Sequence, residues 1–281
     1  MDLYDLHTHT TCSDGAVCPE RLAALAEEQK LAGFAVTDHD TMRGAKAAEA
    51  AGRALGLRVL PGAELSAFDP ETGRKVHLLV YLPHCCEALE PVFRRVSESR
   101  EEACLRSLAL LKKRFPIREE DARFFANGGT LFRTHLMRAL MERGYADRVF
   151  GPFYHELFGQ GGFAYAPVEY LPAEKAAAAI RESGGIAVLA HPGVYDSFET
   201  GRFLAKKGLL DGIEAFYPRR KAEDEKKIEL LAEEFSLFKT GGTDFHGFYS
   251  SPAHPLGACR TTEETVLKIF ELSEKRKSYA I

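Results

Sequence analysis

The stretch Tyr4-Asp5-Leu6-His7-Thr8-His9 combines a predicted short strand with two histidines, a residue type that often binds metals. On an extended chain, side chains alternate between two faces, so the imidazoles of His7 and His9 point to the same side. Two imidazoles on one face can share a metal ion. A single histidine at the end of a strand is more often an ordinary core or surface residue. Further candidate ligands elsewhere in the chain are therefore needed to identify a metal site.

The same arrangement recurs along the chain. Short apolar runs alternate with longer segments of helical period, which is typical of βα units around a parallel sheet. Seven strands are predicted, over Tyr4 to His7, Phe34 to Thr37, Arg58 to Glu64, Lys75 to Leu82, Gly185 to His191, Gly212 to Phe216, and Leu237 to Gly241. Parallel barrels place their active sites at the carboxyl ends of their strands. Nearly every predicted strand ends in an acidic or metal-binding side chain; the strand that ends near Glu214 is the exception, with no clear ligand.

Nine side chains are therefore candidate metal ligands. They are His7, His9, Asp14, His39, Glu64, His77, His191, Asp244 and His246. Six of the ten histidines belong to this set, whereas chance would scatter them over helices and loops. Catalytic zinc-type sites use about three protein ligands and a water, so nine groups suit two or three divalent ions, with Glu64 as a bridging carboxylate. Nitrogen and oxygen ligands without thiolate fit Mn, Zn or Fe alike.

Two carboxylates flank one candidate ligand. Asp38 and Asp40 stand on either side of His39. They are expected either to orient imidazoles as hydrogen-bond acceptors or to fix a turn, and the sequence leaves both roles open.

The alternation of strands and helices fails once, over residues 84–171. Pro91 begins a long charged helix that runs toward Phe115, and no strand follows it. Three shorter helices are predicted after it, over Glu119 to Ala126, Thr134 to Arg143, and Pro152 to Phe158. We therefore expect a barrel domain made of residues 1–83 and 172–281, with residues 84–171 as a helical insertion that covers the active site.

Composition limits the class of protein. The 281 residues carry a net charge of −4, with 45% hydrophobic and 28% charged residues, which excludes disordered and fibrous proteins. The slight negative charge argues against a surface for duplex DNA, but short single-stranded substrates stay possible. The chain begins without a signal-peptide pattern and lacks an apolar run of about 18 residues, so the expected compartment is the cytoplasm. The sequence leaves the oligomeric state open.

Five of these motifs together resemble the PHP (polymerase and histidinol phosphatase) superfamily. They are Asp5-Leu6-His7-Thr8-His9 with Ser13-Asp14-Gly15, Thr37-Asp38-His39-Asp40-Thr41, Gly62-Ala63-Glu64, Ala190-His191-Pro192, and Thr243-Asp244-Phe245-His246. The resemblance implies an α/β fold, a distorted (β/α)7 TIM-like barrel, and a trinuclear metal centre in a phosphoesterase. By this likeness His7, His9, Glu64 and Asp244 would hold one ion, Asp14, His39 and His246 a second, and Glu64, His77 and His191 a third.

Within the superfamily, the length, Asp14 and the helical insertion resemble the bacterial branch of nucleoside 3′,5′-bisphosphate phosphatases and 5′-3′ exoribonucleases. That branch often carries Arg-Pro-His in the insertion, where this chain has Arg133-Thr134-His135. Arg133 and His135 are therefore expected to clamp a substrate phosphate, since arginine offers a planar fork of donors. The alternative, given equal weight, is that Arg133 only begins a helix and points into solvent. Relatives also tend to carry arginine after His-Pro-Gly, and Val194-Tyr195 in this chain departs from that pattern.

The expected activity is hydrolysis of phosphate monoesters or diesters of nucleotides or short single-stranded oligonucleotides by a metal-bound hydroxide. One alternative is a metal-dependent amidohydrolase that cleaves C–N bonds, because these enzymes also carry His-x-His on the first strand. They usually place a lysine or glutamate on the fourth strand, where this chain has His77. The other alternative is a metal-binding module without catalysis, although the ligand set shows no gap.

Overall fold

A nine-stranded sheet forms the centre of the computed structural model, which describes residues 3–247 and 254–277. Its strands are β1 (Leu3–Asp5), β2 (Gly33–Val36), β3 (Arg58–Phe68), β4 (Lys75–Tyr81), β5 (Leu171–Pro172), β6 (Ile186–Leu189), β7 (Gly212–Phe216), β8 (Phe238–Gly241) and β9 (Thr261–Thr262). They lie in the order β8-β7-β6-β4-β3-β2-β1-β9, and β5 pairs with β3.

The sheet curls until its two ends meet. The Leu6 N–H donates to the Gly241 carbonyl oxygen at 3.2 Å, and beyond it Thr8 pairs in parallel with Phe245. These bonds join β1 to the end of β8 and nearly close a barrel. The predicted distorted TIM-like barrel is thereby confirmed.

Two of the described strands run against the others, namely β4 and the two-residue β9, which is antiparallel to β1. Strand β4 is antiparallel to both β3 and β6, so the prediction of an all-parallel barrel sheet is wrong at this strand. The cause is the short connection between Phe68 and Lys75, since a parallel crossover needs a dozen or more residues. The start of β4, and not its end, therefore lies at the carboxyl edge of the parallel strands. His77 reaches that edge as the third residue of the strand, which corrects the expectation that it follows a strand end.

Helices cover the outside of the barrel. They are α1 (Pro19–Glu28), α2 (Ala45–Ala54), α7 (Ala173–Glu182), α9 (Phe198–Lys206), α10 (Ala222–Phe235) and α11 (Glu263–Lys277). The short α8 (Pro192–Tyr195) lies instead beside the candidate ligands, where the Tyr195 ring contacts His77. Each longer helix turns apolar side chains inward, as Leu22 in α1 and Ile180 in α7 do, and these pack on the strands. Proline at the first position of α1 is favourable because that N–H has no partner within the helix.

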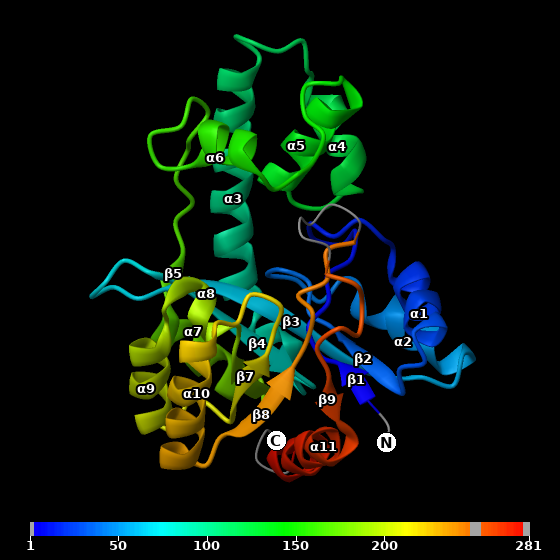
Figure 1. The fold of residues 1–281 in the computed structure, drawn as a ribbon, viewed down its shortest axis with the longest axis vertical. Helices are drawn as coiled ribbons and strands as arrows, with labels where there is room; N and C mark the ends of the chain where they lie inside the picture. Colours follow the sequence, from blue (N-terminus) through cyan, green and yellow to red (C-terminus); the bar gives the residue numbers. More distant parts are fainter. Residues whose placement is uncertain (1–2, 248–253, 278–281) are drawn as a thin grey trace.

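Apart from the short 3-10 helix η1 (Cys86–Ala88) and the first turns of α3 (Glu90–Leu111), the helices of residues 84–171 stand away from the barrel (Figure 1). The others are α4 (Glu119–Ala126), α5 (Arg133–Glu142) and α6 (Pro152–Phe158). Buried side chains of α3 to α6, such as Leu108, Leu136 and Phe158, form an apolar cluster of their own. Leu89, Val92 and Phe93, at the start of α3, pack instead in an apolar cluster of the barrel. The predicted bounds of α4 and α6 agree with the structure, whereas α5 begins one residue earlier, at Arg133.

Within the described residues, no helix combines the length and the apolar character that a membrane crossing needs.

Candidate metal centre

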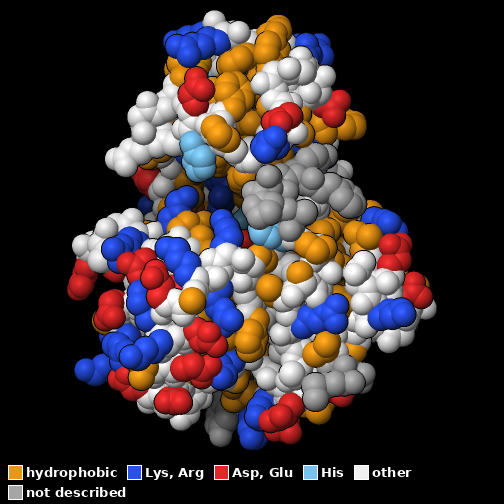
Figure 2. Space-filling view, in the orientation of Figure 1, with side chains coloured by type: hydrophobic (Ala, Val, Ile, Leu, Met, Phe, Trp, Pro, Cys, Tyr) orange, Lys and Arg blue, Asp and Glu red, His pale blue; other side chains and the backbone are white. Residues whose placement is uncertain are grey.

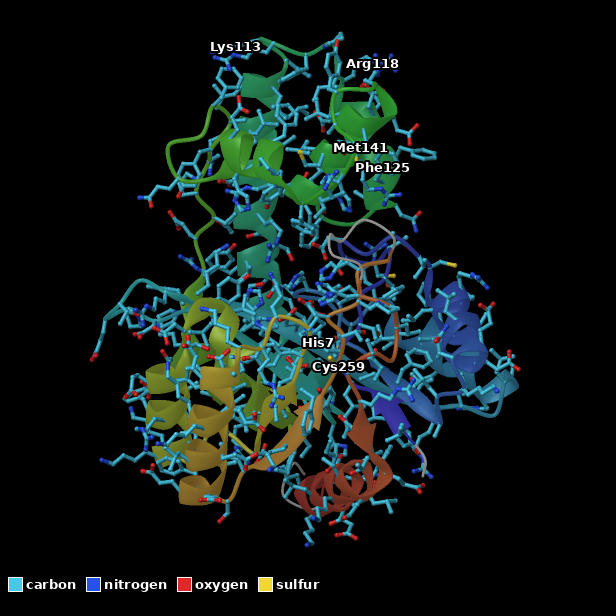
Figure 3. The ribbon with its side chains drawn as sticks, in the orientation of Figure 1. His7, Lys113, Arg118, Phe125, Met141 and Cys259 are labelled. Carbon is cyan, nitrogen blue, oxygen red and sulfur yellow. The ribbon has the colours of Figure 1, made fainter. Side chains whose placement is uncertain are left out.

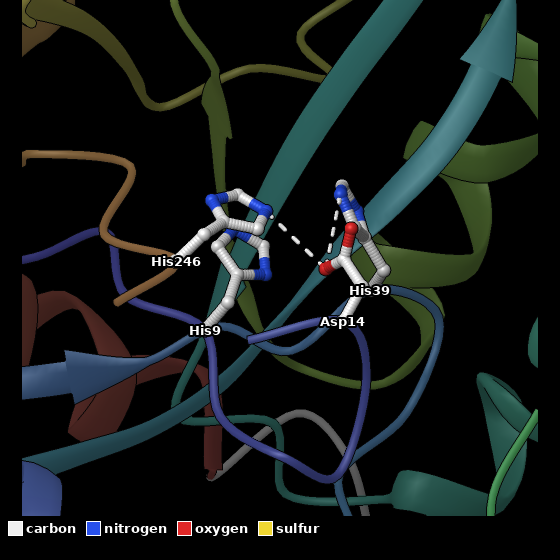
Figure 4. A group of neighbouring side chains, drawn as sticks. All are labelled: His9, Asp14, His39 and His246. Carbon is white, nitrogen blue, oxygen red and sulfur yellow. Dashed lines mark ion pairs between the residues drawn. The ribbon is translucent and has the colours of Figure 1, made fainter. Parts of the chain in front are cut away.

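All nine candidate ligands meet at the carboxyl edge of the parallel strands, facing the helices of residues 84–171. Their donor atoms form three groups in which every atom lies within 4.8 Å of the others. The groups are His7, His9, Glu64 and Asp244; His9, Asp14, His39 and His246; and His39, Glu64 and His77. Figure 4 shows the second group, with the Asp14 carboxylate between the rings of His39 and His246. His191 joins the cluster through Glu64, because its Nε2 lies 2.9 Å from Glu64 Oε1.

Glu64, on β3, lies at the centre of this cluster and is completely buried. Five imidazoles face its two oxygens. Oε2 lies 3.2 Å from His7 Nε2, 3.2 Å from His9 Nε2 and 3.1 Å from His39 Nδ1, while Oε1 lies 2.7 Å from His77 Nδ1 and 2.9 Å from His191 Nε2. One carboxylate that touches ligands of several groups has the geometry of a bridge between ions.

Several donor atoms in the cluster are buried without a hydrogen-bond partner among the described residues. They are His7 Nε2, His9 Nδ1 and Nε2, Asp14 Oδ1, His39 Nδ1, Glu64 Oε2 and His191 Nδ1. An unsatisfied buried polar atom costs about 1–3 kcal/mol, so a folded protein tolerates seven in one place only for a reason. Divalent cations satisfy such lone pairs directly, and the nitrogen and oxygen donors suit them. The residues present therefore fit a metal centre.

The cluster keeps its carboxylates ionised. Burial raises the pKa of Glu64, but the attraction of His77, His7 and His39 outweighs burial and holds that pKa well below its usual range. The same balance lowers the pKa of Asp14, where His246 and His39 supply the attraction. Burial lowers the pKa of His77 to about 4, so this imidazole is neutral at pH 7. Metal binding requires ionised carboxylates and neutral imidazoles. Burial lowers the pKa of His9, but its hydrogen bonds to Asp244 and Glu64 outweigh burial and raise that pKa to about 10, so a bound cation would displace a proton from this ring.

Glu214 is a functional side chain that the sequence analysis missed. It is buried on β7 and lies 3.1 Å from His7 Nδ1 through Oε1, and it accepts the backbone N–H of His191 at 2.8 Å through Oε2. Strand β7, which was predicted to carry no clear ligand, therefore contributes by orienting two candidate ligands. The available signal was a glutamate facing inward within the apolar run Gly212 to Phe216.

The carboxylates beside His39 fix the backbone. Asp38 accepts the Thr10 N–H and hydroxyl at 2.7 Å and the Ser13 hydroxyl at 2.6 Å, which shapes the loop that presents Asp14. Asp40 accepts the Ser66 N–H at 2.9 Å and binds Arg100. Of the two roles left open by the sequence, the turn role is the one that these bonds support.

A cavity of about 250 Å³ opens above the cluster, between the barrel and the helices of residues 84–171. Figure 2 shows the hollow from outside, with Lys and Arg side chains gathered near it, and Figure 3 places His7 deep in the barrel, far from Lys113 and Arg118. The lining combines cations and aromatic rings. It includes Lys75, Arg100, Arg133, Arg219, Phe132, Phe150, Tyr154, Tyr170 and Tyr195.

The two residues predicted to bind a substrate phosphate lie in different environments. Arg133 lines the cavity from the first position of α5, and one of its amino groups donates to the Ala166 carbonyl. His135 is buried behind it and is not among the lining side chains. The Nδ1 atom of His135 accepts the Phe132 N–H at 3.2 Å and so caps α5. Its contact with substrate stays a prediction.

Known proteins with similar sequences or structures agree with this site. The family model of the PHP domain matches residues 5–124. Phosphoribosyl 1,2-cyclic phosphate 1,2-diphosphodiesterase of Eggerthella lenta is 36% identical over 253 residues, which cover 89% of this chain and 96% of that protein. The 5′-3′ exoribonuclease Rnm of Escherichia coli is 32% identical over 257 residues, or 87% of this chain and 85% of that enzyme.

Among solved structures, a protein of Bifidobacterium adolescentis assigned as a metal-dependent phosphoesterase superposes with a TM-score of 0.89 at 28% identity, covering 96% of both chains. A second solved structure, described as an amidohydrolase of Chromobacterium violaceum, superposes with a TM-score of 0.81 at 26% identity, covering 97% of this chain and 96% of that chain. The relatives identified by sequence are named for phosphoester cleavage, which favours that reaction over C–N hydrolysis and over a module without catalysis. The chain belongs to the PHP family of metal-dependent phosphoesterases and is a hydrolase of phosphoric esters.

Proposed function

We propose that this phosphoesterase acts on nucleotides or on the ends of short single-stranded oligonucleotides, using two or three divalent ions of Mn, Zn or Fe. The observation that carries the proposal is the cavity above three adjoining donor groups, lined by cations and aromatic rings. The relatives support the same class, since one is named for a phosphoribosyl cyclic phosphate and another for RNA.

The nine side chains are proposed to divide into three ligand sets. His7, His9, Glu64 and Asp244 would hold one ion, Asp14, His39 and His246 a second, and Glu64, His77 and His191 a third. The three measured groups support this division, although His9 also lies near the second set and His39 near the third. Divalent ions in such a site supply Lewis acidity toward phosphate oxygens and an activated water as nucleophile.

The chain itself selects the substrate. Lys75 and Arg133 line the cavity without a carboxylate partner in the ion pairs of the described residues, so both are available to a phosphate. Phe132, Tyr154 and Tyr170 offer flat apolar faces that suit a nucleobase or a sugar. A volume of about 250 Å³ is at the low end for ligand sites, which fits one nucleotide or the terminal nucleotide of a longer strand.

We propose residues 84–171 as a cap domain over a barrel domain of residues 1–83 and 172–281. The apolar cluster that the second half of α3 shares with α4, α5 and α6 supports this division, while Val92 and Phe93 at the start of α3 attach the cap to the barrel core. The cap brings Phe132, Arg133 and Tyr154 to the cavity, so it contributes to substrate selection and excludes water from the reacting phosphate.

A substrate panel tests the proposal. The metal-free protein is loaded with Mn²⁺, Zn²⁺ or Fe²⁺ and mixed with a nucleoside 3′,5′-bisphosphate, a 5′-phosphorylated RNA tetramer and a sugar cyclic phosphate diester. We expect release of phosphate or of mononucleotides from at least one of the first two substrates, with Asp244→Asn reduced at least 100-fold. A folded, loaded protein that attacks only the sugar diester, or none of the three, would refute the proposed substrate class.

A further inference from the structure

One cap side chain reaches down to the barrel and touches the segment that carries a candidate ligand. Arg100 lies in the middle of α3, and its side chain is only 11% exposed. Its guanidinium Nη2 donates to Asp40 Oδ2 at 2.6 Å and to the Ser66 hydroxyl at 2.9 Å. Asp40 is fully buried, so this pair is removed from solvent.

Asp40 is the residue that follows His39, and its backbone is strained. Its φ is +53°, in the left-handed region that residues other than glycine rarely adopt. The Asp40 N–H donates to the Glu64 carbonyl at 2.9 Å, and its Oδ1 accepts the Ser66 N–H at 2.9 Å. Arg100 completes this set of bonds, because it neutralises the carboxylate that holds the strained residue in place.

A stack of flat groups joins the same arginine to the His39 ring. The guanidinium carbon of Arg100 lies 4.6 Å from the centre of the Phe132 ring. The Phe132 ring lies 6.0 Å from the His39 ring, with 23° between their planes. Phe132 precedes α5 of the cap, so Arg100 and Phe132 contact His39 and its neighbour from two different cap helices.

Burial of this ion pair is not explained by stability alone. A buried pair gains little net stability over apolar side chains of similar size, because both charges lose their hydration. The ion pair instead fixes geometry, since the two-pronged guanidinium of arginine holds the carboxylate in one orientation. The orientation fixed here is that of the segment holding His39, whose atoms belong to two of the three donor groups.

We propose that Arg100 is a positioning residue of the metal centre: through Asp40 it holds His39 in place and ties the cap to the barrel. The inference uses the proposed ligand role of His39 and does not depend on the substrate. Arg100 has no contact with the reacting groups in this role; it acts through its neighbours.

Titration of metal-free protein with Mn²⁺ tests the proposal. Arg100→Gln is expected to bind Mn²⁺ about tenfold more weakly than the wild type, at the low end of the loss seen when a direct partner of a metal ligand is removed, because Arg100 acts on His39 through Asp40. Arg100→Lys retains a charge but loses the fork, so its affinity should lie between the two. The matched control is Arg106→Gln on the same helix, where the arginine is exposed and bonds to Glu102 and the Pro167 carbonyl. Its affinity should equal that of the wild type.

A double variant distinguishes a loss of positioning from a loss of stability. Arg100→Gln leaves a charged carboxylate buried alone, whereas Arg100→Gln with Asp40→Asn removes both charges and should restore much of the melting temperature. If Arg100 only stabilised the fold, the double variant would regain the affinity for Mn²⁺ as well. Weak binding by the stable double variant supports positioning, and wild-type binding by any folded variant lacking Arg100 overturns it. A wild-type protein inactive on every phosphate ester would refute the proposed substrate and leave this titration decisive.

Discussion

Both ring nitrogens of His7 face carboxylates, Nε2 toward Glu64 and Nδ1 toward Glu214. An imidazole held in this way keeps one orientation and presents one nitrogen to an ion. Single residues around the cluster therefore decide how well it binds metal, even when they are not ligands.

Replacing Glu214 by glutamine tests this directly. Glu214→Gln keeps the shape but removes the negative charge beside His7 Nδ1, so we expect Mn²⁺ affinity to fall roughly 10- to 100-fold. Titration of the metal-free protein measures the change. Glu233→Gln, at an exposed position of α10, is the control and should bind normally. Equal affinities in the two variants would contradict the role of Glu214.

His135 predicts a pH dependence of stability. Burial lowers its pKa to about 4, below the 6.5 of an exposed histidine, so the unfolded chain binds the proton more readily. The contribution of this residue is complete above pH 6.5 and is lost as the pH falls from 6.5 to 4. The melting temperature of His135→Gln should therefore depend less steeply on pH in that window. Parallel slopes for the variant and the wild type would show that His135 titrates normally.

Arg133 is expected to bind a phosphate of the substrate. Arg133→Ala should raise KM for a nucleoside bisphosphate by about tenfold with a smaller change in kcat, because a charged hydrogen bond to the bound substrate is lost. Steady-state kinetics measure both parameters. Arg143→Ala, at the opposite end of α5, removes an arginine bound to Asp121 and serves as the control. An unchanged kcat/KM for Arg133→Ala would exclude the contact.

At the scale of elements, the barrel positions its ligands through close contacts between strand ends. The segment after β8 passes against the end of β1, and the Phe245 N–H donates to the His7 carbonyl at 3.2 Å. Gly242 lies at the closest point of this passage, where a Cβ atom would overlap the backbone N and the Cβ of His7. Only glycine allows the two segments to approach so closely.

Gly242→Ala should therefore push β1 and β8 apart. We expect a loss of about 1–3 kcal/mol in the free energy of unfolding, typical of overpacking, together with a lower metal content. Urea unfolding and elemental analysis measure the two effects. Gly208→Ala, where a Cβ atom meets nothing within 4 Å, should cost only backbone strain at φ +70° and retain the metal. A Gly242→Ala protein with full metal content would disprove the steric argument.

At the scale of the whole molecule, the candidate ligands join segments that lie far apart in the chain. All nine come from the barrel, whose apolar side chains are packed in several clusters. The ligands come from positions 7 to 246, so ions bound by them link the first strand of the barrel to the last. Such ions bind the folded state only, and they stabilise it by mass action.

Removal of metal should lower the stability of the entire protein. At an ion concentration about 1,000 times the dissociation constant, one bound ion contributes about 4 kcal/mol. For a protein of this size that corresponds to a fall in the melting temperature of roughly 10 °C after chelation. Differential scanning calorimetry before and after chelation measures it, and added Mn²⁺ should restore the original value. Unchanged melting in the metal-free protein would argue against a centre that spans the barrel.

Features that depend on neighbouring residues could be predicted from the sequence alone. The two-residue spacing of His7 and His9 put both imidazoles on one face, and the prolines at 19 and 152 marked the starts of helices. Most candidate ligands were visible because they lie in or just after a short apolar run, and runs of that kind become barrel strands, whereas Asp14 lies in the loop after the first strand. These signals are local, so they persist before any tertiary contact forms.

The direction of β4, the closure of the barrel, and the partners of Glu214 and Arg100 emerge only in the folded chain. Each depends on partners far away in the chain: Glu214 meets His7 across 207 positions, and Arg100 meets Asp40 across 60. An isolated glutamate or arginine has the same sequence pattern whether it faces solvent or a buried partner. The free energy that selects between these environments arises from packing and desolvation in the folded chain, and periodicity carries no record of it.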